Sequence, residues 1–348
     1  MRKIIDSHLH IINWREGDFI SCFDSYVKKN ELSAINICSV PFERSNVSNN
    51  VMLGIYKLAC PNTYVHAGIE LLEIPIDNMP SDMDAVTQYR ELMEMGFDGI
   101  KMLEGKPNEH KRVGGNLNHP SLNALYAEME RDGTHLLMHV NDPDEFWDLD
   151  RAPQWAIDKG WTYTDGTFAS YEEIQRQTIK ILEDYPRLSL TLAHFFFCSK
   201  TPELLEKLFA LYPNLCVDLT PGGEMYVEFE KNYDYYKDFF EKYHQRLVFG
   251  TDRSRGCDEK FADWLYNMVT TFVGTDKSVA SFDNKELKGL GLSNEKSDNI
   301  LFANFEKRVG VSPKPMNKEK FKAYIEKYYF AISDEEKKKL APLIEKYL

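Results

Sequence analysis

The chain has 348 residues and a net charge of −13; 43% of its residues are hydrophobic and 28% are charged, which is typical of a soluble globular protein. The acidic balance argues against nucleic acid or an anionic membrane as a partner, and no apolar run approaches the roughly 20 residues of a membrane span. The six cysteines contain no CxxC pair and fit free thiols in a reducing compartment. We therefore expect a cytoplasmic protein that acts on a small molecule; a homo-oligomer is compatible with the sequence.

Eight short apolar runs alternate with longer segments of helical pattern. Their richness in Ile, Leu and Val is typical of parallel strands that are buried on both faces. The runs are residues 3–8, 34–40, 64–70, 99–103, 136–140, 188–194, 215–219 and 247–251. Eight β-then-α units in order predict an α/β fold, a (β/α)8 TIM-like barrel.

The segments between the runs carry helix signals. Gly96 ends one amphipathic segment as a C-cap, and Ser170 with Glu173 forms a capping box at the start of another. Aromatic residues recur at spacings of three and four between Tyr226 and Tyr243, which is typical of a helix face packed on a core.

The C-terminal part of the chain differs in composition from the barrel. Residues 316–348 are rich in Lys and Glu and carry an apolar stripe, which predicts a terminal helical pair packed on the barrel. We expect a single domain over residues 1–348, with the barrel over about 1–310 and a C-terminal helical extension over about 311–348.

Three of the loops that follow strands are longer than a barrel requires. They cover residues 105–119, 142–169 and about 274–293. Barrels place their chemistry on the face where strands end, so we expect these loops to act as lids or substrate walls.

A His-x-His motif ends the first predicted strand, in Asp6-Ser7-His8-Leu9-His10. Residues two apart in a strand point to the same side, so His8 and His10 both face the catalytic mouth of the barrel. Two buried imidazoles are costly to leave unpaired, and one metal ion satisfies both.

Three further candidate ligands stand at strand ends. His139 ends the fifth run, His194 the sixth and Asp252 the eighth. Any one of these residues alone is more often structural, but the whole set converging on one mouth predicts a metal site. His66, in mid-strand, and His135, at a strand start, are expected to be structural.

These residues resemble the amidohydrolase superfamily, and within it the amidohydrolase-related branch that includes aminocarboxymuconate semialdehyde decarboxylase. The resemblance covers residues 1 to about 310. It rests on the motifs at 6–10, 96–101, 246–252 and 300–305 and on His139 and His194.

The resemblance implies that His8, His10, His139 and Asp252 bind one divalent ion, most often Zn²⁺, although such a donor set also accepts Mn²⁺ and Fe²⁺. It implies that His194 lies outside the ligand set and positions the water or the developing oxyanion. Asp252 would also receive the proton of the activated water.

Lys101, at the end of the fourth run, leaves two alternatives open. In two-metal members of the superfamily a carboxylated lysine here bridges both ions, and His139 and His194 would then hold the second. The alternative, which we favour, is an ammonium that meets a substrate carboxylate.

Other polar residues near the strand ends are candidates for substrate binding. Arg253 and Arg255 follow Asp252, Asn141 follows His139, and Trp14 is expected to form part of the pocket wall. The local excess of cations predicts an anionic substrate.

The leading hypothesis is a metal-dependent hydrolase of an amide, lactone or ester bond. The alternative is a non-oxidative decarboxylase of an unsaturated or aromatic carboxylic acid, since both activities occur in the resembled branch. A third hypothesis is a degenerate barrel that binds without catalysing.

Overall fold

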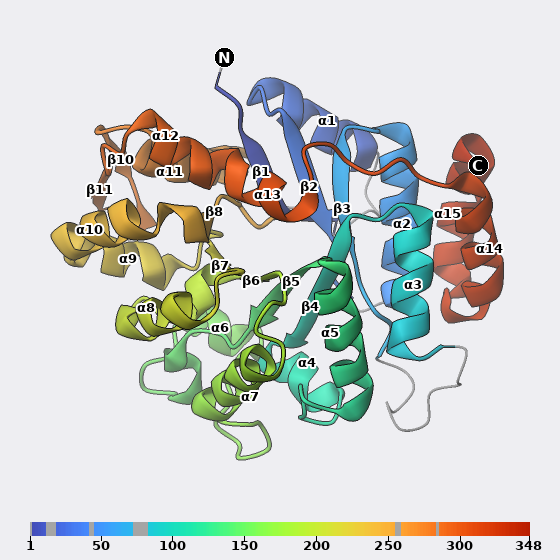
Figure 1. The fold of residues 1–348 in the computed structure, drawn as a ribbon, viewed down its shortest axis with the longest axis horizontal. Coiled ribbons are helices and arrows are strands. Elements are labelled where there is room, and N and C mark those ends of the chain that lie inside the picture. Colours follow the sequence, from blue (N-terminus) through green and yellow to red (C-terminus); the bar gives the residue numbers. More distant parts are fainter. Residues whose placement is uncertain (1, 12–18, 42–44, 72–82, 255–258, 283–284) are drawn as a thin grey trace.

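The computed structural model describes residues 2–11, 19–41, 45–71, 83–254, 259–282 and 285–348. Within them, nine parallel strands form one curled sheet in the order β8-β7-β6-β5-β4-β3-β2-β1-β9, surrounded by helices (Figure 1). The strands are β1 Ile5–His10, β2 Ala34–Cys38, β3 Thr63–Ala67, β4 Gly99–Gly105, β5 His135–Val140, β6 Leu190–Leu192, β7 Leu215–Asp218, β8 Leu247–Val248 and β9 Arg253–Ser254. The predicted α/β barrel is confirmed.

Strands β8 and β9 together take the place of the predicted eighth strand. The expectation of one unbroken strand over 247–251 was wrong, because the chain leaves strand geometry after Val248 and Asp252 adopts a φ of 55°. The interrupted segment nevertheless closes the sheet on β1: the Ser7 N–H donates to the Phe249 carbonyl at 3.1 Å, and the Asp252 N–H donates to the His8 carbonyl at 2.9 Å. The first and last strands thus form the seam of the barrel.

Helices connect successive strands and cover the outside of the sheet. The α-helices are α1 Phe19–Lys29, α2 Asn46–Ala59, α3 Ala85–Met95, α4 Pro107–Arg112, α5 Pro120–Asp132, α6 Gln154–Asp158, α7 Tyr171–Asp184, α8 Pro202–Leu211, α9 Gly223–Lys231, α10 Tyr233–Tyr243, α11 Glu259–Gly274, α12 Asn294–Asp298, α13 Asn304–Val309, α14 Lys318–Tyr328 and α15 Asp334–Tyr347. The predicted C-cap at Gly96 is confirmed, with a φ of 100° that suits glycine. Among the described residues, no helix is both long and apolar enough to cross a membrane.

The aromatic stripe between Tyr226 and Tyr243 packs on the core, as predicted. It is carried by two helices, α9 and α10, because the helical backbone is interrupted at Asn232. Tyr226, Phe229, Tyr236 and Phe240 are all buried.

The predicted terminal helical pair is also confirmed. Helices α14 and α15 lie beside α3 and α2 at one side of the barrel (Figure 1). The Tyr328 hydroxyl donates to Glu91 of α3 at 2.7 Å. Phe321 packs so closely on Gly54 of α2 that a Cβ at that glycine would lie 2.4 Å from the phenyl ring.

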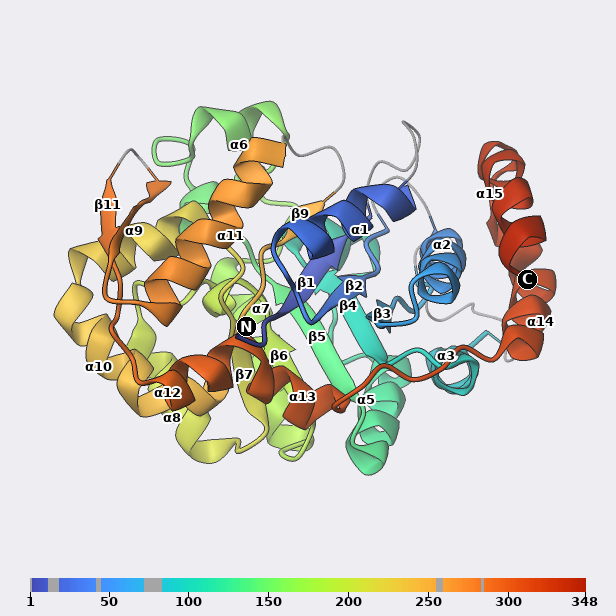
Figure 2. The same cartoon turned by 90° about the horizontal axis from the view of Figure 1, so that it is seen from above.

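The long loop after β5 is ordered and carries a small aromatic core of its own. It contains a 3₁₀ turn, η3 (Asp144–Trp147), and helix α6, which lies on the side of the barrel where β9 ends (Figure 2). Phe146 and Tyr163 form its buried centre, and Trp161 and Phe168 pack against them. We call residues 142–169 the lid.

Candidate metal centre and its cavity

His8 and His10 present two bare ring nitrogens to each other at the end of β1. Nδ1 of His10 lies 2.9 Å from the Cys38 carbonyl, which can only accept, so Nδ1 carries the proton and Nε2 does not. Nδ1 of His8 lies 2.8 Å from Oδ2 of Asp218. The two Nε2 atoms are 3.0 Å apart. In neutral rings two lone pairs would face each other there, and Nζ of Lys101, 3.2 Å from Nε2 of His8, is the neighbouring cation among the described residues.

Asp218 fixes the tautomer of His8. It ends β7, and its Oδ1 accepts hydrogen bonds from the backbone N–H of His194 at 2.8 Å and of Thr220 at 3.1 Å, and from the Thr220 hydroxyl. Its other oxygen is left for the Nδ1–H of His8. A carboxylate that orients a metal-binding imidazole in this way is a common companion of metal sites. Asp218 was not among the predicted site residues, although it stands near the end of a predicted strand, as His139 and His194 do.

Asp252 completes a group of three ligand-type side chains. Its Oδ1 lies 3.2 Å from Nε2 of His10 and 4.0 Å from Nε2 of His8. Burial favours the neutral acid, but in the metal-free chain a hydrogen bond from protonated His10 and the charges of the neighbouring imidazoles outweigh it and hold the pKa of Asp252 well below its ordinary value. The ligand atoms of His8, His10 and Asp252 all lie within 4.8 Å of one another. Two bare imidazole nitrogens and one carboxylate oxygen fit a divalent ion such as Zn²⁺.

His139 and His194 lie together in the wall next to this group. Their ring centroids are 4.8 Å apart, and His194 lies 5.8 Å from His8. Nε2 of His139 lies 2.8 Å from the Asn141 carbonyl and therefore carries a proton, so only its Nδ1 could bind an ion. The His8–His10–Asp252 group does not include His139, and its role as a fourth ligand stays a prediction.

His194 is held as a neutral acceptor. Its Nδ1 lies 3.3 Å from the Thr220 carbonyl and 3.2 Å from the Thr220 hydroxyl, whose own proton goes to Asp218, so Nδ1 must donate and Nε2 is left as an acceptor. Burial, with the nearby His139, lowers the pKa of His194 to about 4. Of the two roles expected from the sequence, this tautomer suits positioning a water better than donating to an oxyanion.

Three residues at or next to the site have left-handed backbone conformations. Asn141, His194 and Asp252 have φ values of 65°, 54° and 55°, and the left-handed turn continues through Phe197. Such conformations are unfavourable for residues other than glycine and concentrate at functional sites.

Lys101 lies beneath the group rather than in the cavity wall. Its Nζ is 3.2 Å from Nε2 of His8, where an ammonium donates to the same lone pair that an ion would use. Burial lowers the pKa of Lys101. The position is compatible with the carboxylated form, and it offers no contact between a plain ammonium and a substrate in the cavity.

The remaining predicted substrate residues are spread more widely. The Arg253 guanidinium stacks on the Tyr26 ring, 4.2 Å from its centroid, and it does not line the cavity. Asn141 is buried and donates to the Tyr171 carbonyl at 3.1 Å, outside the cavity wall. Trp14 and Arg255 lie outside the described residues, so their expected roles stay predictions.

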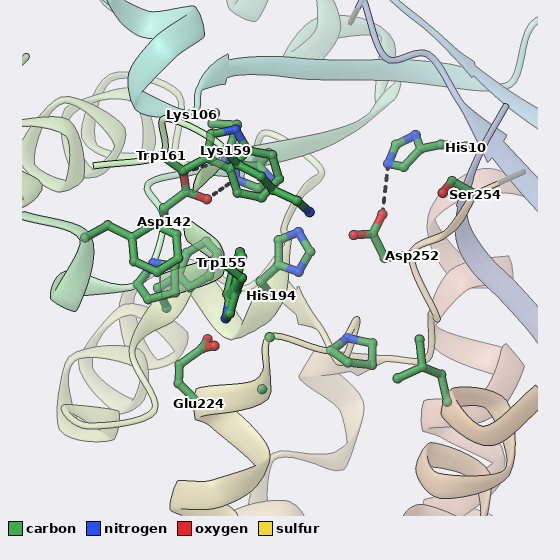
Figure 3. A pocket seen from close by; sticks show the side chains of 18 of the residues that line it. His10, Lys106, Asp142, Trp155, Lys159, Trp161, His194, Glu224, Asp252 and Ser254 are labelled. Atoms are coloured by element: carbon green, nitrogen blue, oxygen red, sulfur yellow. Dashed lines mark hydrogen bonds and ion pairs between the residues drawn. The ribbon is translucent and has the colours of Figure 1, made fainter. Parts of the chain in front are cut away.

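A cavity of about 460 Å³ opens in front of His10, His139, His194 and Asp252 (Figure 3). The lid supplies much of the opposite wall, which is aromatic and carries cations. Lid residues of this wall include Asp142, Phe146, Trp155, Lys159 and Trp161, and other strand-end segments add Lys106, Phe197, Glu224 and Phe282. This confirms that the loop at 142–169 forms a wall of the cavity.

Asp142 anchors the lid to the barrel. It accepts from Lys106 and from the Tyr163 hydroxyl, and its Oδ1 lies 3.5 Å from Nε2 of His139. Burial opposes ionisation, but the Lys106 ammonium and His139 hold the pKa of Asp142 well below its ordinary value. The charge of Lys106 is therefore balanced inside the protein.

Glu224 is a carboxyl in the cavity wall, in the first turn of α9. Its Oε1 is buried without a hydrogen-bond partner among the described residues. Burial, with smaller contributions from the Glu145 and Asp142 charges, raises the pKa of Glu224 from 4.5 to about 7.

This shift predicts a pH-dependent gain in stability for the Glu224→Gln variant. A carboxyl whose folded pKa is raised contributes stability that is complete below its unfolded pKa and is lost as the pH rises through about 7. The amide does not titrate. The unfolding free energy of the variant, relative to that of the unchanged chain, should therefore rise between pH 5 and pH 8, by at most on the order of 3 kcal/mol. Urea unfolding at both pH values measures the difference. Glu326→Gln, on the exposed side of α14, is the control, and an equal pH trend in both variants would refute the assignment.

Comparisons with known proteins place the fold. No protein-family model matches the sequence, and no curated protein matches it closely enough to count as a relative. Solved structures do match. A protein of Staphylococcus aureus assigned as an amidohydrolase has a TM-score of 0.56 at 15% identity, over 89% of this chain and 100% of that one. A 2,6-dihydroxybenzoate decarboxylase bound to 2,6-dihydroxybenzoate has a TM-score of 0.54 at 11% identity, over 89% and 100%. A protein of Acinetobacter baumannii assigned as a 2-pyrone-4,6-dicarboxylic acid hydrolase has a TM-score of 0.51 at 12% identity, over 88% and 99%.

Proposed function

Starting from the amidohydrolase-superfamily fold that this chain has, we propose that it is a metal-dependent hydrolase of an amide, lactone or ester bond in a small anionic substrate. One observation carries the proposal. The Nε2 atoms of His8 and His10 are 3.0 Å apart and lie next to Oδ1 of Asp252, at the edge of a cavity large enough for a small molecule.

A divalent ion held by His8, His10 and Asp252 would polarise a carbonyl and lower the pKa of water toward about 7. The protein's own groups then handle the water and its proton. His194 accepts a hydrogen bond at Nε2 and so orients a water in the cavity, because Thr220 holds its Nδ1. Asp252 stays ionised and can take the proton of that water at Oδ2 and pass it to the leaving group.

Decarboxylation of an unsaturated or aromatic acid is the second candidate. It is favoured by the aromatic wall of the cavity, formed by Phe146, Trp155 and Trp161 of the lid, and by the likeness in fold to the decarboxylase bound to an aromatic acid. Release of CO₂ from a panel of aromatic acids, set against hydrolysis of lactones, esters and amides, discriminates the two. Turnover on neither panel by metal-loaded protein would instead support the non-catalytic barrel.

Metal content tests whether the chain binds the divalent ion that both candidate functions require. Protein purified without chelators should contain about one divalent ion per chain by plasma mass spectrometry, and the His10→Ala variant should lose it. His244→Ala removes a histidine at the end of α10, outside the cavity, and should keep the ion. Two ions per chain would instead indicate the carboxylated form of Lys101, and no retained ion in the unchanged chain would refute the proposal.

A further inference from the structure

We propose that Lys159, Trp155 and Trp161 of the lid form a subsite that binds the carboxylate and the flat face of an unsaturated or aromatic acid. The proposal rests on the proposed function, which places the reacting bond at the metal centre, and it names the substrate class and the residues that hold the far end of the substrate.

Lys159 extends from the end of α6 into the cavity. Its ammonium lies 4.7 Å from the ring centroid of Trp161 and 5.5 Å from that of Trp155. Figure 3 shows the side chain directed toward the space between His194 and Asp252, rather than outward from the lid. Lys159 is exposed at the mouth of the cavity, where its ammonium lies over two rings and can meet an anionic ligand.

The charges of the cavity leave Lys159 without a counter-charge. Lys106, the other cation in the wall, is buried against Asp142 and its charge is balanced there. Asp252 belongs to the metal centre, and burial raises the pKa of Glu224 to about 7, so that its negative charge is only partial near neutral pH. Among the described residues, Lys159 forms no ion pair. An anionic group of the substrate would supply the missing charge.

The tryptophans supply the complementary apolar surface. Trp155 is 50% exposed although it lines the cavity, and its ring meets that of Trp161 edge-on at a centroid distance of 6.0 Å. Phe146 supports Trp155 from behind at 5.5 Å. The half-exposed indole of Trp155 beside a cation suits a planar conjugated acid, whose ring covers that indole while its carboxylate meets the ammonium; the ring of Trp161 already has the Lys106 ammonium 4.2 Å from its centroid.

Two of the cations expected from the sequence to bind the anion, Arg253 and Lys101, are engaged elsewhere in the described part of the chain. Arg253 stacks on Tyr26, and Lys101 contacts His8 beneath the metal centre. This leaves the lid, rather than the strand ends, as the source of the anion contact among the described residues.

The test uses benzoate as the probe and benzamide as its neutral counterpart, with binding followed by tryptophan fluorescence and by calorimetry on metal-loaded protein. Benzoate should bind at least about tenfold more tightly than benzamide, the size of one charge-assisted contact. Lys159→Met should abolish this preference, and Lys159→Arg should keep it. Trp161→Leu should weaken both probes.

Two further variants locate the contact. Lys111→Met is the matched control, because Lys111 also lies over an aromatic ring of the lid, Phe168 at 4.4 Å, but does not line the cavity; it should leave both affinities unchanged. His10→Ala should lose the metal and still bind benzoate. The proposal is overturned if benzoate does not bind, or if His10→Ala abolishes its binding while Lys159→Met does not. Neither result would contradict the hydrolase proposal, which is tested separately by metal content and turnover.

Discussion

The Asp218→Asn variant should bind a divalent ion roughly 10- to 100-fold more weakly than the unchanged chain. In the structure, Oδ1 of Asp218 accepts from the His194 and Thr220 backbone, so an asparagine must keep its carbonyl oxygen there and turn its NH₂ toward His8. Nδ1 of His8 must then accept, which moves the ring proton to Nε2. A protonated Nε2 cannot be a metal ligand.

Competition with a chromophoric chelator measures the affinity, and nitrogen-detected NMR of the imidazoles reports the tautomer. Thr220→Val is the control, because it removes one donor to Asp218 and leaves the carboxylate that holds His8. Unchanged affinity in Asp218→Asn, or an equal loss in both variants, would show that Asp218 does not set the tautomer of His8.

The Lys57→Met variant should lose about 3–5 kcal/mol of unfolding free energy, as expected when one partner of a buried ion pair is removed. Both side chains of the Lys57–Asp98 pair are at most 1% exposed. Asp98 also accepts from the Val65 N–H at 2.7 Å and from the Lys314 N–H at 2.8 Å, so it joins α2, β3 and the segment that leads to α14. Without the ammonium, the Asp98 charge is left buried with backbone partners only.

Urea unfolding measures the loss. Lys28→Met is the matched control, since Lys28 pairs with Asp24 on the surface, with side chains 74% and 44% exposed, and should change the unfolding free energy little. The double variant Lys57→Met/Asp98→Asn should recover part of the loss, because it removes the stranded charge. Equal losses in Lys57→Met and Lys28→Met would contradict the assignment.

Local patterns were enough to predict the barrel and the centre of the site. Short β-rich runs predict strands because strands buried on both faces contain few polar residues. Position within a run then separated the histidines at the candidate site from those inside the barrel. His10 at a strand end lines the cavity and His8 contacts it, whereas His66 and His135 hydrogen bond to each other at 2.7 Å inside the barrel. The places where the sequence was misread, after Val248 and at Asn232, are local breaks in backbone geometry that hydrophobic periodicity does not register.

The supporting residues escaped prediction because their roles depend on contacts between distant parts of the chain. Asp218 acts through His8, and Asp142 acts through Lys106, which follows a different strand. Lys159 is an ordinary surface residue by sequence, and only the folding of the lid over the barrel mouth brings its ammonium above Trp161. Arg253 was predicted to bind substrate because it follows the predicted ligand Asp252. Its guanidinium instead stacks on the Tyr26 ring, a contact that the sequence does not indicate.

The seam of the barrel sets the order in which the site can be assembled. His8 and His10 belong to the first strand, whereas Asp252 lies between the two segments that close the sheet on that strand. During synthesis, the two imidazoles leave the ribosome long before the carboxylate that completes the group. The full set of proposed ligands therefore exists only after the last strand has docked, so the proposed ion would be selected by the finished barrel rather than by the growing chain.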